Sequence, residues 1–325
     1  MDGIINLYKP AGMTSFQCVA AIKRIFKTKK VGHAGTLDPE ATGVLPICLG
    51  KATKLAELFL CCPKSYRGKV LFGRATDTQD VWGQTLEEKD ASKLTIEQVR
   101  MAAEKFRGEI EQTPSAFSAI KINGQPLYKK ARAGVDVEVP SRKVFVYDFS
   151  VGTDTDDNLV DVEGGKKEIV VNTTCSRGTY VRTLCFDLGR QVGLPACMSE
   201  LCRTSYGPLG LEDAVTLEQL EAGTDTDLEK FVLPLHYILK NYTCIDVTDI
   251  QLKRFINGLP TTVAKYQLKT LPEDFLYPKA ESDKAYLMYK GKMVAMVFMG
   301  TDTENDRVLI KSWKYFGGPE INADN

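Results

Sequence analysis

The chain has 325 residues and a mass of 36.0 kDa, and its 42 Lys and Arg residues balance 42 Asp and Glu residues. The zero net charge excludes a whole-chain basic excess as an argument for nucleic-acid binding, but it leaves room for local basic patches. With 43% hydrophobic and 26% charged residues, the composition is globular and excludes disorder or a fibrous repeat. The length allows one large domain and one smaller domain.

Membrane and secretion signals are not found. Apolar stretches such as 58–62 and 294–299 are much shorter than the roughly 20 residues of a spanning helix. Residues 1–10 lack the basic and apolar regions of a secretion signal, so we expect a cytoplasmic chain without a membrane partner. Nine scattered cysteines with no C-x-x-C pair argue against a disulfide framework and a zinc ribbon. With only two histidines, His33 and His236, no metal site is expected.

The sequence up to about residue 243 predicts a succession of strands and helices. A strand is expected at 3–8, and Thr14 with Gln17 forms a capping box that starts a helix. Residues 31–43 fit neither the helical nor the strand period, so we expect a glycine-rich loop there. The remaining expected elements are helices at 52–62, 95–106, 126–133 and 180–192, strands at 66–73, 118–124, 143–149 and 168–173, an acidic loop at 154–157 and a connector at 223–243.

The last part of the chain reads as a small mixed domain. A helix capped by Thr248 and Gln251 ends at Gly258. Strand-like runs follow at 285–289, 293–299 and 308–315. Roughly 80 residues is near the lower size limit for independent folding.

The most unusual segment is the glycine-rich stretch 32–44, which places Asp38 directly before a proline. Asp before Pro also commonly starts a turn, so this pattern alone leaves a structural role open. With so few histidines, we expect any chemistry to use carboxylates, phenols or amines.

These residues also belong to a longer set of motifs. Segments 3–15 and 31–45 resemble the opening and catalytic motifs of the TruB family of pseudouridine synthases. Further similar blocks follow in the same order at 65–67, 75–80, 112–124, 128–134, 175–184, 187–189 and 201–204. The resemblance covers about residues 3–210 and is only general beyond them.

The resemblance implies an α+β pseudouridine synthase fold, with a mixed, largely antiparallel sheet flanked by helices. Residues 1–240 would form the catalytic domain, with an RNA-gripping insertion at about 75–140. Residues 241–325 would form a small PUA-like RNA-binding domain.

The implied activity is isomerisation of a uridine to pseudouridine in the T-loop of tRNA, at position 55. Asp38 would be the nucleophile, Tyr66 would stack against the target base, and Arg182 would keep Asp38 ionised. The resemblance does not tell whether Asp38 attacks the sugar or the base. No cofactor is implied.

Four further residues are implied to contact the substrate. His33 would help to hold the flipped-out nucleotide, because a base must leave its stack before Asp38 can reach it. Tyr180 and Leu201 would surround the uracil. Lys9 would complete this set by bracing the catalytic loop.

Two basic clusters predict salt-dependent contacts with the tRNA T-arm. The first surrounds the opening motifs and the second follows residue 120. The first contains Lys9, Lys23, Arg24, Lys27, Lys29, Lys30, Lys51 and Lys54; the second contains Lys121, Lys129, Lys130, Arg132, Arg142 and Lys143.

Three alternatives stay open from the sequence. A non-catalytic RNA-binding or RNA-folding protein would not need Asp38, and a guide-dependent TruB-like synthase acting on other RNAs fits the compact chain less well. A metal-dependent hydrolase on Asp77 and Asp80 is weak, because hard-cation sites gather more oxygen ligands, and both residues are expected to be structural. We expect the chain to be a monomer.

Overall fold

The computed structural model describes residues 1–118, 121–122, 125–127, 131, 139–152, 158–269, 283–302 and 307–317. The acidic loop at 154–157 and most of the strand and helix predicted between 118 and 133 lie outside these residues. Within that region, the described strands β8 (Lys121–Ile122) and β9 (Gln125–Pro126) pair with each other.

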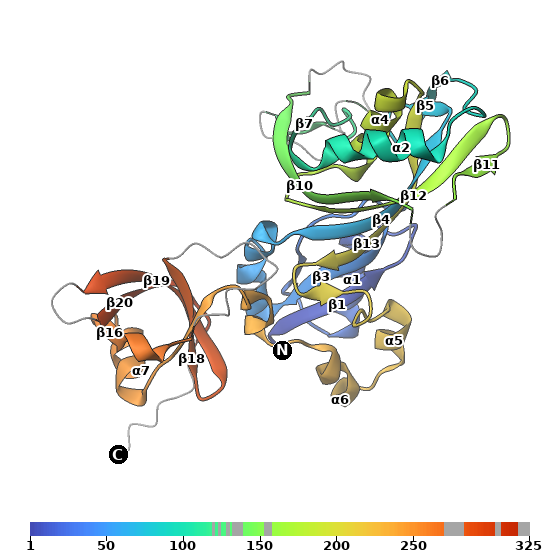
Figure 1. Ribbon diagram of the computed structural model, residues 1–325. Helices are drawn as coiled ribbons and strands as arrows, with labels where there is room; N and C mark the ends of the chain where they lie inside the picture. The colour runs from blue at the N-terminus through green and yellow to red at the C-terminus, as the bar shows by residue number, and fades with distance from the viewer. Residues whose placement is uncertain are drawn as a thin grey trace.

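A mixed, largely antiparallel sheet forms the body of the molecule, as predicted (Figure 1). Among its described strands, β3 and β13 are the parallel neighbours, and the other pairs are antiparallel. Its main path is β1 (Gly3–Lys9), β3 (Thr42–Leu49), β13 (Ala196–Tyr206), β4 (Lys64–Phe72), β12 (Lys166–Cys175), β10 (Arg142–Val151) and β7 (Gly108–Gln112), while β2 (Val31–His33), β14 (Leu209–Gly210) and β11 (Val160–Val162) pair at its sides.

Helices pack against this sheet through separate apolar clusters. Helix α1 (Ser15–Ile25) has the predicted capping box and packs on β1 and β3. Helices α2 (Ile96–Ala103) and α4 (Val181–Val192) lie side by side over the other half of the sheet (Figure 1). The short 3₁₀ helix η3 (Glu104–Phe106) continues α2, and a small hairpin of β5 (Arg74–Thr76) and β6 (Thr85–Glu88) stands next to them.

Three sequence expectations in the body were wrong. The helix expected at 52–62 is instead two 3₁₀ helices, η1 (Gly50–Leu55) and η2 (Leu58–Cys61), whose tighter turns bury Leu55 and Phe59 completely. The stretch at 31–43 is not all loop, because its start forms β2. Strand β13 was missed, although it lies in the middle of the sheet.

The connector expected at 223–243 returns along β1. Ile4 and Leu233 exchange two backbone hydrogen bonds of 2.9 and 2.8 Å. The region from residue 217 holds short helices: α5 (Leu217–Ala222), α6 (Asp225–Leu228), η4 (Glu229–Phe231) and η5 (Leu235–Leu239).

The C-terminal part is a second, curled sheet with its own apolar core, consistent with a PUA-like fold (Figure 1). The predicted capped helix and all three predicted strands are present. In order, the sheet contains β16 (Thr261–Ala264), β20 (Arg307–Tyr315), β19 (Lys292–Asp302), β18 (Lys284–Tyr289), β15 (Thr243–Asp246) and β17 (Leu268–Lys269), next to α7 (Asp249–Ile256) and η6 (Lys265–Gln267).

The second sheet packs directly on η1 and η2 of the body. Lys314 forms an ion pair with Glu57 at 2.7 Å, and Lys54 donates a hydrogen bond to the Tyr315 carbonyl at 2.7 Å. No helix among the described residues is long and apolar enough to cross a membrane.

Candidate active site

Asp38 lies on the loop between β2 and β3. Its neighbours Leu37 and Ala41 are buried in the same apolar cluster, at 4% and 2% exposure. By contrast, the Asp38 side chain is 49% exposed. The loop is therefore fastened by apolar residues on both sides of a carboxylate that stays open to solvent.

Residues of the opening segment 3–15 bind the backbone of this loop. The Ser15 hydroxyl accepts a hydrogen bond from the Leu37 amide at 3.0 Å. Lys9 is fully buried, and its Nζ donates to the carbonyls of Pro10 and Pro39 at 2.8 and 2.7 Å. Burial lowers the pKa of Lys9. The contacts of Lys9 are thus with the loop backbone, in keeping with the bracing expected of it.

Arg182, in the first turn of α4, faces the Asp38 loop. Its Nη1 is 3.7 Å from Oδ2 of Asp38 and 3.5 Å from Oδ2 of Asp80, and its Nη2 donates to the Phe117 carbonyl at 2.7 Å. The expected proximity of Arg182 and Asp38 is therefore present. Asp80 is more than the structural residue that the sequence suggested, because it shares this guanidinium.

Asp80 is held by its own turn. Thr78 donates a side-chain hydrogen bond to Oδ1 of Asp80 at 2.6 Å, and the Trp82 amide donates to the same oxygen at 3.2 Å. Asp77, in contrast, accepts from the Gln84 amide at 2.8 Å. The contact recorded for Asp77 stabilises the turn, as expected, whereas Asp80 also turns an oxygen toward Arg182.

Tyr66 and Arg203 face each other on neighbouring strands β4 and β13. Arg203 is 1% exposed, and it donates from Nε to the Val44 carbonyl at 2.7 Å and from Nη2 to the Gly35 carbonyl at 3.0 Å. Burial raises the pKa of the Tyr66 phenol, and the charge and hydrogen bond of Arg203 oppose this increase. Tyr66 is therefore neutral at physiological pH and presents a ring and an O–H donor.

Gly43 allows β3 to approach β13 closely. It has a φ of +98°, and a Cβ at this position would lie 2.3 Å from the Arg203 carbonyl oxygen. A side chain at residue 43 would separate the two strands. The glycine therefore keeps the Asp38 loop next to the strand that carries Leu201 and Arg203.

Each of the three other expected substrate contacts has a recorded relation to Tyr66, Arg182 or Arg203. Leu201 is 7% exposed and shares an apolar cluster with Tyr66. Tyr180 is the N-cap residue of α4, and its ring centroid is 5.5 Å from the Arg182 guanidinium carbon. His33 lies on β2, and burial, followed by the charge of Arg203, lowers its pKa, so the imidazole is neutral at pH 7.

The basic clusters are only partly described. Lys129, Lys130 and Arg132 lie outside the described residues. In the first cluster, Arg24 pairs with Glu221 and Lys51 with Asp2. The RNA contacts of the two clusters remain predictions, except for Lys9, whose complete burial contradicts a contact with RNA phosphates.

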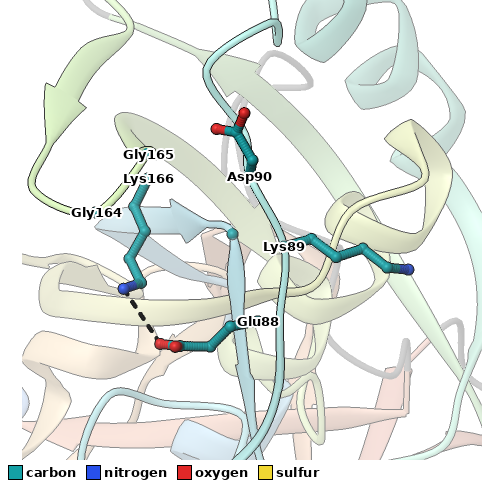
Figure 2. Close-up of a pocket in the computed structure, with 7 residues that line it drawn as sticks. Glu88, Lys89, Asp90, Gly164, Gly165 and Lys166 are labelled. Atoms are coloured by element: carbon teal, nitrogen blue, oxygen red, sulfur yellow. Dashed lines mark ion pairs between the residues drawn. The ribbon is translucent and has the colours of Figure 1, made fainter.

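We also searched the described residues for clusters of metal-binding side chains and for surface pockets. Within the described ranges, no group of three or more His, Cys, Asp or Glu residues could hold a metal ion. Figure 2 shows a surface pocket of about 410 Å³, in which Lys166 pairs with Glu88 at 3.1 Å. None of its lining residues belongs to the site around Asp38.

Sequence reasoning missed the roles of Arg203, Gln112 and Arg142 at this site. Arg203 and Gln112 stood inside the recognised motif blocks, but nothing in the sequence distinguished them from surface residues. Gln112 is fully buried and binds the Tyr180 backbone, while the Arg142 guanidinium carbon is 4.6 Å from the Tyr180 ring centroid.

Comparisons with known proteins agree with this arrangement. The family model for the N-terminal domain of TruB family pseudouridylate synthase matches residues 23–181, and the model for the tRNA pseudouridylate synthase B C-terminal domain matches residues 182–240. A tRNA pseudouridine synthase B from Levilactobacillus brevis is 42% identical over 88% of this chain and 94% of its own length. One from Clostridium tetani is 42% identical over 80% of this chain and 85% of its own.

A solved structure shares the fold across both sheets. The structure of an H/ACA RNP bound to a substrate RNA containing 2′-deoxyuridine matches with a TM-score of 0.68 and 24% identity, covering 97% of this chain and 85% of that chain. Together with the curated relatives, which align over most of their length, the matches establish the family. The chain belongs to the TruB family of pseudouridine synthases.

Proposed function

We propose that this chain isomerises the uridine at position 55 in the T-loop of tRNA to pseudouridine, with Asp38 as the nucleophile. The observation that carries the proposal is the 3.7 Å approach of Arg182 to an exposed carboxylate on a fastened loop. The name that these relatives share, tRNA pseudouridine synthase B, supports tRNA as the substrate class.

The chemistry requires the N1–C1′ bond of uridine to break and a C5–C1′ bond to form, while C5 loses its proton and N1 gains one. A carboxylate supports this by attacking either C1′ or C6, and in both cases it must be anionic. Arg182 places a positive charge 3.7 Å from this carboxylate. Asp80 would help to hold that guanidinium in place, because its Oδ2 lies 3.5 Å from the same Nη1 atom.

The neighbouring residues would hold the base while it turns. Tyr66 offers its ring face for stacking, and its raised pKa keeps the phenol a hydrogen-bond donor near C5. Tyr180 and Leu201 would complete the uracil pocket. His33 would support the nucleotide after it leaves the RNA stack, and Lys9 would act through the loop backbone.

The two sheets would belong to domains with different functions, catalysis and RNA binding. We take residues 1–240 as the catalytic domain, with an RNA-gripping insertion at about 75–140, and residues 241–325 as a PUA-like RNA-binding domain. The enzyme would act as a monomer on the T-arm in the cytoplasm.

Release of tritium from C5-labelled uridine in a tRNA transcript tests the proposal. The wild-type chain should release tritium, and Asp38→Asn should not, while its affinity for tRNA stays within about tenfold. Turnover by Asp38→Asn would overturn the nucleophile assignment. Binding without release by the wild-type chain would favour a non-catalytic RNA-folding protein.

A further inference from the structure

The Gln112 side chain binds both the backbone amide and the backbone carbonyl of Tyr180. The Tyr180 amide donates to Oε1 of Gln112 at 3.0 Å, and Nε2 of Gln112 donates to the Tyr180 carbonyl at 3.0 Å. Gln112 is fully buried at the end of β7. Its side chain thus gives Tyr180 the pair of hydrogen bonds that a neighbouring strand would give, just before α4 begins.

Arg142 holds the ring of the same tyrosine. Its guanidinium carbon lies 4.6 Å from the Tyr180 ring centroid, within the range of a cation–π contact. Arg142 is the register partner of Gln112 across β10 and β7. One pair of facing residues therefore contacts both the backbone and the ring of Tyr180.

Arg142 lacks the partners of an ordinary structural arginine. Among the described residues, its buried Nε and Nη2 atoms have no hydrogen-bond partner, and no carboxylate lies within ion-pair distance. The adjacent Lys143, in contrast, pairs with Glu109 at 2.8 Å. A guanidinium with one edge unpaired contributes little as an ion pair, so its contact with the Tyr180 ring is the interaction to explain.

The same two residues mark where the segment 113–141 leaves and rejoins the sheet. The Thr113 and Ser141 hydroxyls lie 2.6 Å apart and fix the two ends together. Tyr180 therefore contacts the two residues that flank this segment, and it lies two residues before Arg182. A displacement of Tyr180 would also move the start of the helix that carries Arg182.

We propose that Gln112 and Arg142 are positioning residues for Tyr180, and that they orient its ring over the target uracil before the RNA arrives. The inference rests on the proposed function, in which Tyr180 lines the uracil pocket. Preorganisation of this kind lowers the barrier of the bound substrate and leaves affinity nearly unchanged. The loss in variants should therefore fall on the rate of the chemical step.

The test measures pseudouridine formation in a tRNA transcript under single turnover, and tRNA affinity by filter binding. Gln112→Glu keeps the acceptor for the Tyr180 amide but places an oxygen against the Tyr180 carbonyl. Arg142→Lys keeps the charge but loses the planar guanidinium. We expect each variant to react at least tenfold more slowly, with affinity within threefold of wild type.

A double-mutant cycle with Tyr180→Ala separates positioning from other roles. If Arg142 acts through the ring, Arg142→Lys causes no further loss in the Tyr180→Ala background. Additive losses, or losses expressed as weaker tRNA binding, would instead mean a direct phosphate contact and would overturn the inference. Thermal unfolding verifies folding, and Arg142→Lys carries the test if the buried Gln112→Glu does not fold.

Two exposed residues of the same types serve as controls, Arg107 directly before β7 and Gln191 in α4. Arg107 pairs with Asp148 at 3.0 Å, and Gln191 accepts from Lys105 at 3.1 Å. Arg107→Lys and Gln191→Glu should react at the wild-type rate. An inactive wild-type chain would refute the proposed function, whereas an active wild type with additive variants would refute this inference alone.

Discussion

Arg182 and Asp38 approach to 3.7 Å across two elements that are far apart in the sequence, the first turn of α4 and the β2–β3 loop. The arginine is buried, whereas the aspartate is half exposed. This asymmetry suits a nucleophile that must meet substrate while its charge partner stays fixed.

Replacement of Arg182 by lysine should nearly abolish turnover. A lysine is a single point charge and cannot contact Asp38, Asp80 and the Phe117 carbonyl at once. We expect Arg182→Lys to lower the single-turnover rate by at least about 100-fold and to change tRNA affinity by less than tenfold. Near-normal tritium release by this variant would refute the role of Arg182.

Asp80→Asn should slow the reaction by about ten- to 100-fold. The amide oxygen still accepts from Thr78 and Trp82, so the turn survives, but Arg182 loses one of its two carboxylates. Asp77→Asn is the control, because Asp77 contacts a turn amide and not Arg182. Equal rates for the two variants would show that Asp80 is only structural.

Arg203→Met should destabilise the fold by about 2 to 4 kcal/mol, because it leaves the Val44 and Gly35 carbonyls without their donor in a buried position. The free energy of urea unfolding measures this. Arg24→Met removes an exposed ion pair with Glu221 and should change stability by less than about 1 kcal/mol. Similar values for both arginines would contradict the anchoring role of Arg203.

Lys64 predicts a pH-dependent stability. Burial, followed by the charge of Arg203, lowers its pKa from 10.5 to about 8. Between pH 8 and 10.5 the unfolded chain therefore binds more protons than the folded chain. The buried Lys64 destabilises the fold at neutral pH, and this loss of stability is recovered as the pH rises through that range. Lys64→Met should be more stable than wild type by about 1 to 3 kcal/mol at pH 7, and the difference should shrink by pH 10. A constant difference would show that the lysine remains charged.

The half-buried Asp187 predicts the opposite pH dependence, a stability that falls as the pH rises. Burial raises its pKa to about 6 from 3.8, against the charge of Arg190. The folded chain then binds the proton more tightly, so stability falls as the pH rises from about 4 to 6. In urea titrations, the free energy of unfolding of Asp187→Asn should exceed that of the wild type by about 1 to 2 kcal/mol at pH 7. The two values should be equal near pH 4. A variant advantage that persists at pH 4 would rule out titration of Asp187 as the cause.

The sequence predicted the elements with strong local signals. Thr14 and Thr248 each form the predicted capping box with a glutamine three residues later, and Thr95 forms another at the start of the helix expected at 95–106. Strand β13 was missed because its pairing register with β4 shifts between Met198 and Glu200 and again between Arg203 and Ser205, and such irregularities interrupt the alternation of polar and apolar residues. The 3₁₀ helices at 50–61 were taken for one helix because their apolar residues fit either period.

At the site, the motifs supplied Asp38, Tyr66 and Arg182 but not their supports. Arg203, Gln112 and Arg142 act through contacts with residues distant in sequence, such as Val44 and Tyr180. Such contacts depend on strand order and register, which local sequence patterns do not encode.

The parallel meeting of β3 and β13 at Gly43 and Arg203 has a consequence for biosynthesis. The two residues differ in number by 160 (203 minus 43), so their contact has a very long sequence separation. Such contacts form late, because a long loop must close before they are made. A ribosome-bound nascent chain can already contain Asp38 and Tyr66, but it lacks the strand between them until residue 203 has emerged. In the proposed function, the site is therefore complete only after β13 has been synthesised.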